Sequence, residues 1–229
     1  MQGTAQASAT WERHAWAAGI VFVLALLAES VVAVGIGLTH RDSAATIATG
    51  LHAHEGRMIA IACISIVYAV AFVVYLWRLY VLLRGDPARP ADLGILVLVG
   101  GVLFVTLHAV SDIGITGMLG ARVASYSAAH DQGLSFSLYY LTYALDSVAD
   151  VFGSLAFGAA GLLILRSGDL PRRLGWVALA TAPFLLVQGF GLGGVIATFG
   201  LVLDLIGFLL LLVFVVATSV AGYRLASSR

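Results

Sequence analysis

The pattern of hydrophobic and polar positions divides the chain into six long apolar segments with short polar stretches between them. A membrane-spanning helix needs about 20 predominantly apolar residues. The segments of that length are residues 16–38, 57–83, 93–118, 135–165, 174–196 and 198–222. This pattern predicts an all-α, polytopic integral membrane bundle of six transmembrane helices. Residues 16–222 form its single domain, between a polar tail at 1–15 and a short tail at 223–229.

The boundary between the last two segments is marked only by a glycine-rich turn at Gly191, Gly193 and Gly194. The fourth segment is longer than a minimal span, so we expect it to tilt or to extend past the bilayer. The fifth segment contains Pro183, which predicts a kink.

Composition supports a membrane protein and argues against a large soluble domain. Of the 229 residues, 61% are hydrophobic and 10% are charged, and the mean hydropathy is +1.01. Soluble domains carry about 25% charged residues. The net charge is zero, so no overall field favours nucleic acid. The partners expected are the lipid bilayer and a lipophilic small molecule, and the oligomeric state is left open.

Arginine distribution predicts the orientation, because positive residues concentrate on the cytoplasmic side of a membrane. One set of segment ends carries Arg13, Arg78, Arg84, Arg89, Arg166, Arg172, Arg173, Arg224 and Arg229. The opposite set carries only Arg41, Arg57 and Arg122. Both termini are therefore expected in the cytoplasm, with loops 39–56 and 119–134 outside.

A polar stripe follows the fourth segment. Tyr139, Tyr143, Asp146 and Asp150 recur every three or four residues, which places them on one face of a helix. The rest of that segment is apolar. Ionisable groups inside a membrane are costly and mark a functional site by default.

Other segments carry ionisable residues at a similar predicted depth, in the outer half of the bilayer. These are Glu29, His108, Asp112 and Asp204. No arginine or lysine lies deep in any segment. A buried carboxylate without a cation partner must be protonated, bound to a metal or paired with histidine.

We therefore expect one intramembrane site. Its candidate catalytic residues are Asp146, Asp150, Asp112, Glu29 and His108. Its candidate substrate-binding residues are Tyr139, Tyr143, Tyr68, Phe104 and Asp204. Two of these residues could instead have a purely structural role. Asp204 could form a hydrogen bond between helices, and His108 could bond Asp112 on its own helix.

The sequence requires no cofactor, although a divalent metal is compatible with it. The candidate metal ligands are His52, His54 and His108. The spacing of His52, His54 and Glu55 matches no helical zinc signature such as HExxH. The alternative is an interfacial loop with solvated histidines.

The stretch from Leu165 to Trp176, LRSGDLPRRLGW, resembles a known family turn. It is similar to the RSG-x-LP-x-x-LGW turn between the fourth and fifth helices of bacterial six-helix membrane proteins assigned to domain of unknown function 4386 and its relatives. The resemblance implies the fold and a bacterial plasma membrane location, but no activity. A comparison with ceramidase-type membrane hydrolases fails, because the chain lacks their paired HxxxH.

Three functions are compatible with these residues. The first is an enzyme that performs acid–base chemistry, such as cyclisation or isomerisation, on a lipophilic substrate, with aromatic rings stabilising a developing cation. The second is a proton-coupled carrier of a small molecule. The third is a structural or regulatory membrane protein without catalysis, whose acids only join helices.

Overall fold

The computed structural model describes residues 2–39, 42–84, 91–190 and 197–228. Helices form almost all of these ranges, and no strand occurs within them. The six long helical elements begin with α1 (Gln2–Val34), α3 (Glu55–Arg84) and α4 (Ala91–Ala109), and continue with α6 (Gln132–Ser167), α7 (Arg172–Gly189) and α8 (Ala197–Ser227). Four shorter elements are α2 (Ala44–Ala53), α5 (Ala124–Ala129) and the π-helical η1 (Val110–Thr116) and η2 (Leu119–Val123).

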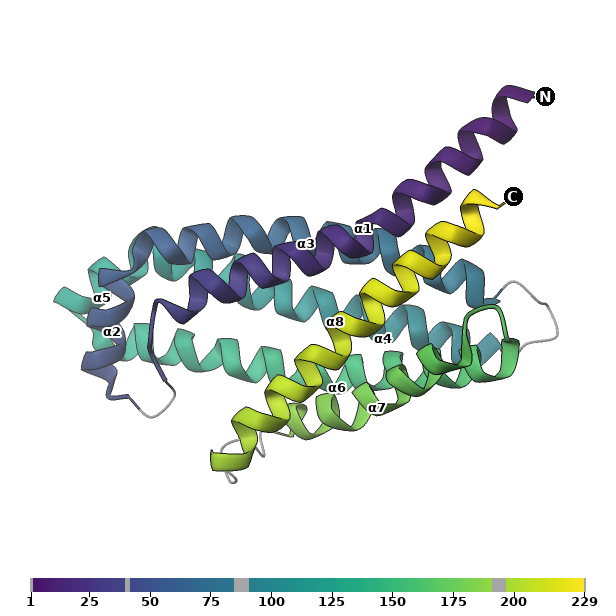
Figure 1. The fold of residues 1–229 in the computed structure, drawn as a ribbon. Helices are drawn as coiled ribbons and strands as arrows, with labels where there is room; N and C mark the ends of the chain where they lie inside the picture. The colour runs from purple at the N-terminus through teal and green to yellow at the C-terminus, as the bar shows by residue number, and fades with distance from the viewer. Residues whose placement is uncertain (1, 40–41, 85–90, 191–196, 229) are drawn as a thin grey trace.

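The long helices form a closed ring. Going round it, α1 packs on α3, α3 on α4, α4 on α6, α6 on α7, α7 on α8, and α8 returns to α1. Both chain termini lie at the same end of the bundle, which we call the terminal end (Figure 1). The short helices α2 and α5 lie at the opposite end, which we call the cap end.

Within the described residues, five helices are long and apolar enough to cross a membrane. They cover Trp11–Val34, Glu55–Arg84, Asp92–Ala129, Gln132–Ser167 and Leu205–Ser227. Helix α7, which corresponds to the predicted fifth span, is not among them. Its 18 described residues include Arg172, Arg173 and Gln188, which lower its mean hydropathy. Five candidate spans are therefore found where the sequence predicted six, and the glycine-rich boundary at 191–196 falls outside the described residues.

The predicted outer loops are largely helical. Helix α2 lies within 39–56, and the helix that begins as α4 runs on to Ala129, well past the expected end at 118. Together they bury a small apolar cluster of Ile47, Leu51, Met58, Leu119 and Ala124. A hydropathy profile assigned these stretches to loops because they are short and partly polar. Their apolar residues are buried only when the cap assembles.

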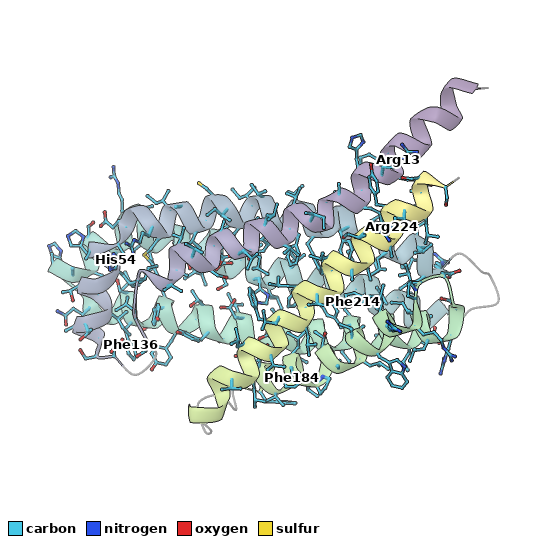
Figure 2. All side chains as sticks on the ribbon, in the orientation of Figure 1. Arg13, His54, Phe136, Phe184, Phe214 and Arg224 are labelled. Atoms are coloured by element: carbon cyan, nitrogen blue, oxygen red, sulfur yellow. The ribbon has the colours of Figure 1, made fainter. Side chains whose placement is uncertain are left out.

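The predicted tails are also helical where they are described. Helix α1 begins at Gln2 and α8 ends at Ser227, so both helices run beyond the predicted boundaries at 16 and 222. Arg13 and Arg224 lie on these extensions at the terminal end, while His54 and Phe136 lie at the cap end (Figure 2).

The third long helix changes its hydrogen-bond register at its centre. In η1 the backbone N–H of Gly117 donates to the carbonyl of Asp112, five residues back, and in η2 the N–H of Ala124 donates to Leu119. Such π-helical segments are rare and occur often at functional sites. Here the first begins two residues after His108 and contains Asp112.

Glycines allow the closest helix contacts. At Gly161 an added Cβ would lie 2.8 Å from the carbonyl oxygen of Gly175, and at Gly175 it would lie 3.0 Å from the carbonyl oxygen of Gly161. The backbones of α6 and α7 therefore touch there. This contact adjoins the 165–176 turn that links the two helices.

This contact predicts that Gly161→Ala lowers the free energy of unfolding by about 1–3 kcal/mol, because the new methyl group overpacks against backbone atoms that cannot move aside. Thermal unfolding of purified protein in a neutral detergent, followed by tryptophan fluorescence, measures the loss. Gly158→Ala is the matched control, since its nearest neighbour would be the Ala182 Cβ at 3.7 Å. Equal stability of the two variants would contradict the contact.

Candidate functional site

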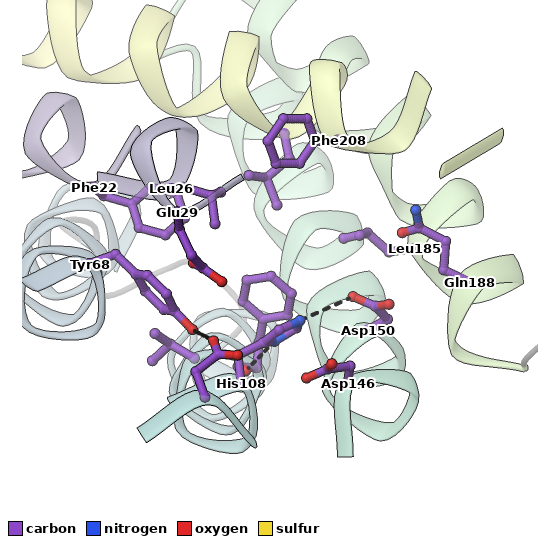
Figure 3. Close-up of a pocket in the computed structure, with 14 residues that line it drawn as sticks. Phe22, Leu26, Glu29, Tyr68, His108, Asp146, Asp150, Leu185, Gln188 and Phe208 are labelled. Carbon is purple, nitrogen blue, oxygen red and sulfur yellow. Dashed lines mark hydrogen bonds and ion pairs between the residues drawn. The ribbon is translucent and has the colours of Figure 1, made fainter. Parts of the chain in front are cut away.

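A cavity of about 260 Å³ lies at the centre of the ring, and each of the six long helical segments contributes to its wall. The polar lining residues are Glu29, Tyr68, His108, Asp112, Asp146, Asp150 and Gln188. The apolar lining residues are Phe22, Leu26, Phe104, Val105, Leu185, Phe208 and Leu211. The site is therefore polar on the side of α4 and α6 and largely apolar on the side of α8 (Figure 3).

All five candidate catalytic residues line this cavity, although they come from three separate segments. Glu29 lies near the end of α1, Asp146 and Asp150 lie midway along α6, and His108 and Asp112 lie where α4 passes into η1. Because α4 and α6 pack side by side, the histidine and the acidic pair face each other.

Asp112 is bound by a tyrosine from the neighbouring helix. The hydroxyl group of Tyr68 on α3 donates to Asp112 Oδ2 at 2.5 Å. Tyr68 is 3% exposed, so this bond is shielded from solvent. Bonds to charged or strongly polar partners are stronger in such surroundings. The contact fixes the carboxyl group of Asp112 and joins α3 to η1.

His108 makes one hydrogen bond and one longer electrostatic contact. Its Nδ1 lies 2.9 Å from the carbonyl oxygen of Phe104, and its Nε2 lies 3.9 Å from Asp150 Oδ1. A carbonyl oxygen only accepts, so Nδ1 carries a hydrogen, and Nε2 is the nitrogen that gains or loses a proton. At 3.9 Å, Nε2 and the Asp150 carboxyl interact electrostatically but share no hydrogen bond, so the cavity contains them as two separate acid–base groups.

His108 and Asp150 lie deep in the bundle, yet both keep part of their side-chain surface accessible. The side chain of His108 keeps 26% of its surface accessible and that of Asp150 keeps 17%, although both lie mid-bundle. Both side chains therefore border the open space of the cavity.

Two carboxyl oxygens in the cavity have no hydrogen-bond partner within the described part of the chain. Among the described residues, nothing hydrogen-bonds to the buried Glu29 Oε2 or to the buried Asp146 Oδ1. An unsatisfied buried polar group costs about 1–3 kcal/mol. Glu29 projects from α1 toward His108, and Asp146 approaches from α6.

None of the described lining residues is an arginine or lysine. The Arg57 guanidinium lies against Gly35, beyond the last turn of α1. Arg78 pairs with Glu12 at 2.6 Å near the terminal end. The deficit of positive charge expected from the sequence is present in the cavity.

Tyr139 and Tyr143 do not line the cavity, so the structure places them apart from the expected substrate site. The Tyr139 hydroxyl donates to the Leu38 carbonyl at 3.1 Å and lies 3.2 Å from the Tyr143 hydroxyl. Tyr139 packs on the apolar cluster of the cap. Both residues share the helix face of Asp146 but lie one to two turns nearer the cap end.

The loop histidines also lie at the cap end. His52 Nδ1 lies 2.8 Å from Glu55 Oε1, and Ser125 donates a hydrogen bond to the same oxygen. Within the described ranges, no three His, Cys, Asp or Glu side chains are arranged to hold a metal. Asp204 belongs to α8, and its side chain falls outside the described residues.

Some lining residues were not among the expected site residues. Gln188 and Leu185 come from α7, and Phe208 and Leu211 come from α8. Gln188 is a polar residue in an apolar segment, so the sequence alone could have indicated that it lines the cavity. Nothing in the sequence distinguishes Leu185, Phe208 and Leu211 from the many other leucines and phenylalanines of the chain. Only the packing of the helices into a ring shows that they line the cavity.

The fold and the site together define an all-helical protein of the multi-pass membrane type, with an acidic cavity enclosed by its helices. The chain belongs to the family described as domain of unknown function DUF4386, whose model matches residues 17–225. This match spans the whole ring and confirms the resemblance drawn from the 165–176 turn. No significant match to a curated protein or to a solved structure was found.

The Tyr68–Asp112 bond predicts a stability effect. Tyr68→Phe should lower the free energy of unfolding by about 1–3 kcal/mol, because it leaves a buried carboxyl oxygen without its donor. Tyr143→Phe is the matched control, since it also removes one hydroxyl group but from a side chain that is 41% exposed. Thermal unfolding in detergent measures both variants. A loss for Tyr68→Phe no larger than that of the control would show that the bond contributes little.

Proposed function

We propose that this protein is a membrane-embedded enzyme that performs acid–base chemistry, of the cyclisation or isomerisation type, on a lipophilic substrate. One observation carries the proposal: His108 faces Asp150 across a cavity that also contains Asp112, and aromatic and aliphatic side chains form the remaining wall. Titratable groups that converge in a largely apolar pocket are typical of catalytic sites.

The chemistry requires a proton donor and a proton acceptor in one cavity. A proton-initiated isomerisation or cyclisation adds a proton to a carbon–carbon double bond and later loses a proton from another carbon, so no oxidant or reductant is needed. In our proposal Asp146 or Asp150 donates the first proton, and His108 accepts the second. Tyr68 holds Asp112 in place through its hydroxyl group.

The apolar wall supports the same chemistry. Phe104 lies against His108 with ring centroids 4.7 Å apart, and Phe22 and Phe208 line the opposite side. Ring faces attract positive charge. They would stabilise a carbocation between the two proton transfers.

The two alternative functions are less well supported. A proton-coupled carrier must open its site to both ends in turn. Toward the terminal end the ring is filled by Trp16, Tyr75 and Thr218, with the Tyr75 hydroxyl 2.7 Å from Thr218 Oγ1. Acids that only joined helices would be satisfied by helix partners, whereas Glu29 Oε2 and Asp146 Oδ1 have none among the described residues.

The location we propose is the bacterial plasma membrane, with six crossings and both termini in the cytoplasm. The ring supports six crossings, since α7 occupies a full place in it between α6 and α8. The family turn supports a bacterial source. The arginine count supports the orientation, because the terminal end carries most of the arginines.

The enzymatic proposal predicts a product that has the elemental composition of its substrate and carries one deuterium when it forms in deuterated water. Membranes that contain the wild-type protein should form such a species when they are incubated in D₂O with lipid extract from cells grown in ordinary water. Membranes with Asp146→Asn or Asp150→Asn should not form it, because asparagine keeps the size of a protonated aspartic acid but cannot release the proton. Chromatography with high-resolution mass spectrometry measures the difference.

Asp92→Asn is the control for this experiment, since Asp92 is an exposed aspartate in the first turn of α4, outside the cavity. It should behave as the wild type. Identical lipid profiles for the wild type and both cavity variants, with all proteins folded and present in the membrane, would refute the enzymatic proposal.

The orientation predicts which residues a membrane-impermeant thiol reagent reaches. In a Cys63→Ala background, Ser43→Cys and Ala129→Cys at the cap end should be labelled in intact cells. Ser228→Cys at the terminal end should be labelled only after permeabilisation. All three positions are exposed, whereas Ser127 in the same cap segment is fully buried and unsuitable. The reverse labelling pattern would invert the orientation.

A further inference from the structure

The cavity contains more acid than its own residues balance. Four carboxyl side chains line it, from Glu29, Asp112, Asp146 and Asp150, and His108 is the single basic side chain among the described lining residues. Even a protonated His108 compensates for only one carboxylate. An apolar pocket of this kind favours either neutral acids or an added positive charge.

A second observation, independent of the charge count, indicates a ligand. The unpartnered atoms Glu29 Oε2 and Asp146 Oδ1 are buried and belong to opposite walls, one on α1 and the other on α6. Natural proteins satisfy nearly all such atoms. A donor placed in the cavity would satisfy both, whereas an anion or an ether oxygen would satisfy neither.

The apolar wall selects the type of cation. Phe22, Tyr68, Phe104 and Phe208 line the cavity, and ring faces attract organic ammonium groups. A bare metal ion prefers a compact shell of oxygen ligands. No three acidic or histidine side chains in the described ranges form such a shell.

The size of the cavity indicates how much of the ligand it holds. Pockets for drug-sized ligands measure about 300–1,000 Å³, and this one measures about 260 Å³. It therefore accommodates a head group with a short part of its chain. Helices α1 and α8 contribute Leu26, Phe208 and Leu211 to its apolar wall. The first part of the alkyl chain would lie against these side chains.

We propose that the cavity binds the ammonium head of an amphiphilic amine, with Glu29 and Asp146 as its paired acceptors and the aromatic side chains around it. The inference deepens the proposed function and rests on the same cavity, since a bound ammonium group resembles the carbocation of a proton-initiated reaction. It assigns the substrate class as an isoprenoid amine, whose double bond receives the proton, and it makes Asp150 the proton donor because Asp146 accepts from the ammonium group.

The test compares three ligands of matched chain length on purified protein in a neutral detergent. Decylamine, whose protonated amine carries three N–H donors, should raise the unfolding temperature in a saturable way, with an affinity at least about tenfold higher than that of 1-decanol or decanoate. Glu29→Gln and Asp146→Asn should each weaken amine binding by about tenfold or more, and Asp92→Asn should leave it unchanged. Equal binding of amine and alcohol, or unchanged binding in both cavity variants, would overturn the inference.

Further outcomes are decisive as well. Stabilisation by Mg²⁺ or Zn²⁺ that the cavity variants abolish, without stabilisation by the amine, would overturn the inference in favour of a metal site. If the variants do not fold, the comparison of the amine, 1-decanol and decanoate on the wild-type protein decides whether the cavity prefers an ammonium head. Deuterium incorporation without amine binding would overturn this inference and leave the enzymatic proposal standing. Amine binding without deuterium incorporation would uphold the inference and refute the enzyme.

Discussion

The burial of four carboxyl groups among apolar helices is the constraint on which the rest of this structure depends. Desolvation makes each acid costly, so each must find a proton, a donor or a cation. Asp112 finds Tyr68, and Asp150 faces His108. Glu29 and Asp146 each retain a buried oxygen with no partner among the described residues. A ligand that donates hydrogen bonds to these two oxygens would remove the free-energy cost of leaving them unpaired. A void left by imperfect packing would be lined by apolar atoms and would have no such cost.

The remainder of the fold holds that cavity open. Below it, toward the terminal end, Trp16, Phe22, Phe72 and Tyr75 form a packed aromatic floor. Beside it, an added Cβ at Gly189 on α7 would lie 2.7 Å from the carbonyl oxygen of Ser147 on α6, so the two helices pack closely there. Close packing at the rim and along the floor allows a void at the centre, because neighbouring side chains cannot relax into it. A site that keeps its acids in fixed positions requires this kind of support.

The change of register after His108 shapes the site from within one helix. A π-helical turn widens the helix and displaces the following residues around its axis. Segment η1 begins there and carries Asp112 toward Tyr68 on the neighbouring helix. The same segment leads into the cap. There Tyr139 on α6 donates a hydrogen bond to the Leu38 carbonyl and packs on the apolar cluster, so it joins α6 to the segment after α1 and to the cap helices. The two tyrosines expected in the site therefore stabilise the cap above it.

The sequence by itself determined the helical class, the family and most of the acidic site, because ionisable residues are conspicuous in apolar segments. Glu29, His108, Asp112, Asp146 and Asp150 all line one cavity. Periodicity assigns residues to a helix face but not to a depth along the helix. For that reason Tyr139 and Asp146 were both predicted to lie in the site, whereas in the structure Asp146 lines the cavity and Tyr139 packs in the cap. The tertiary structure alone decided which apolar side chains complete the cavity, since Phe208 differs from other phenylalanines only in its neighbours. It also decided that the outer segments fold into a helical cap, because their apolar residues are buried only against one another.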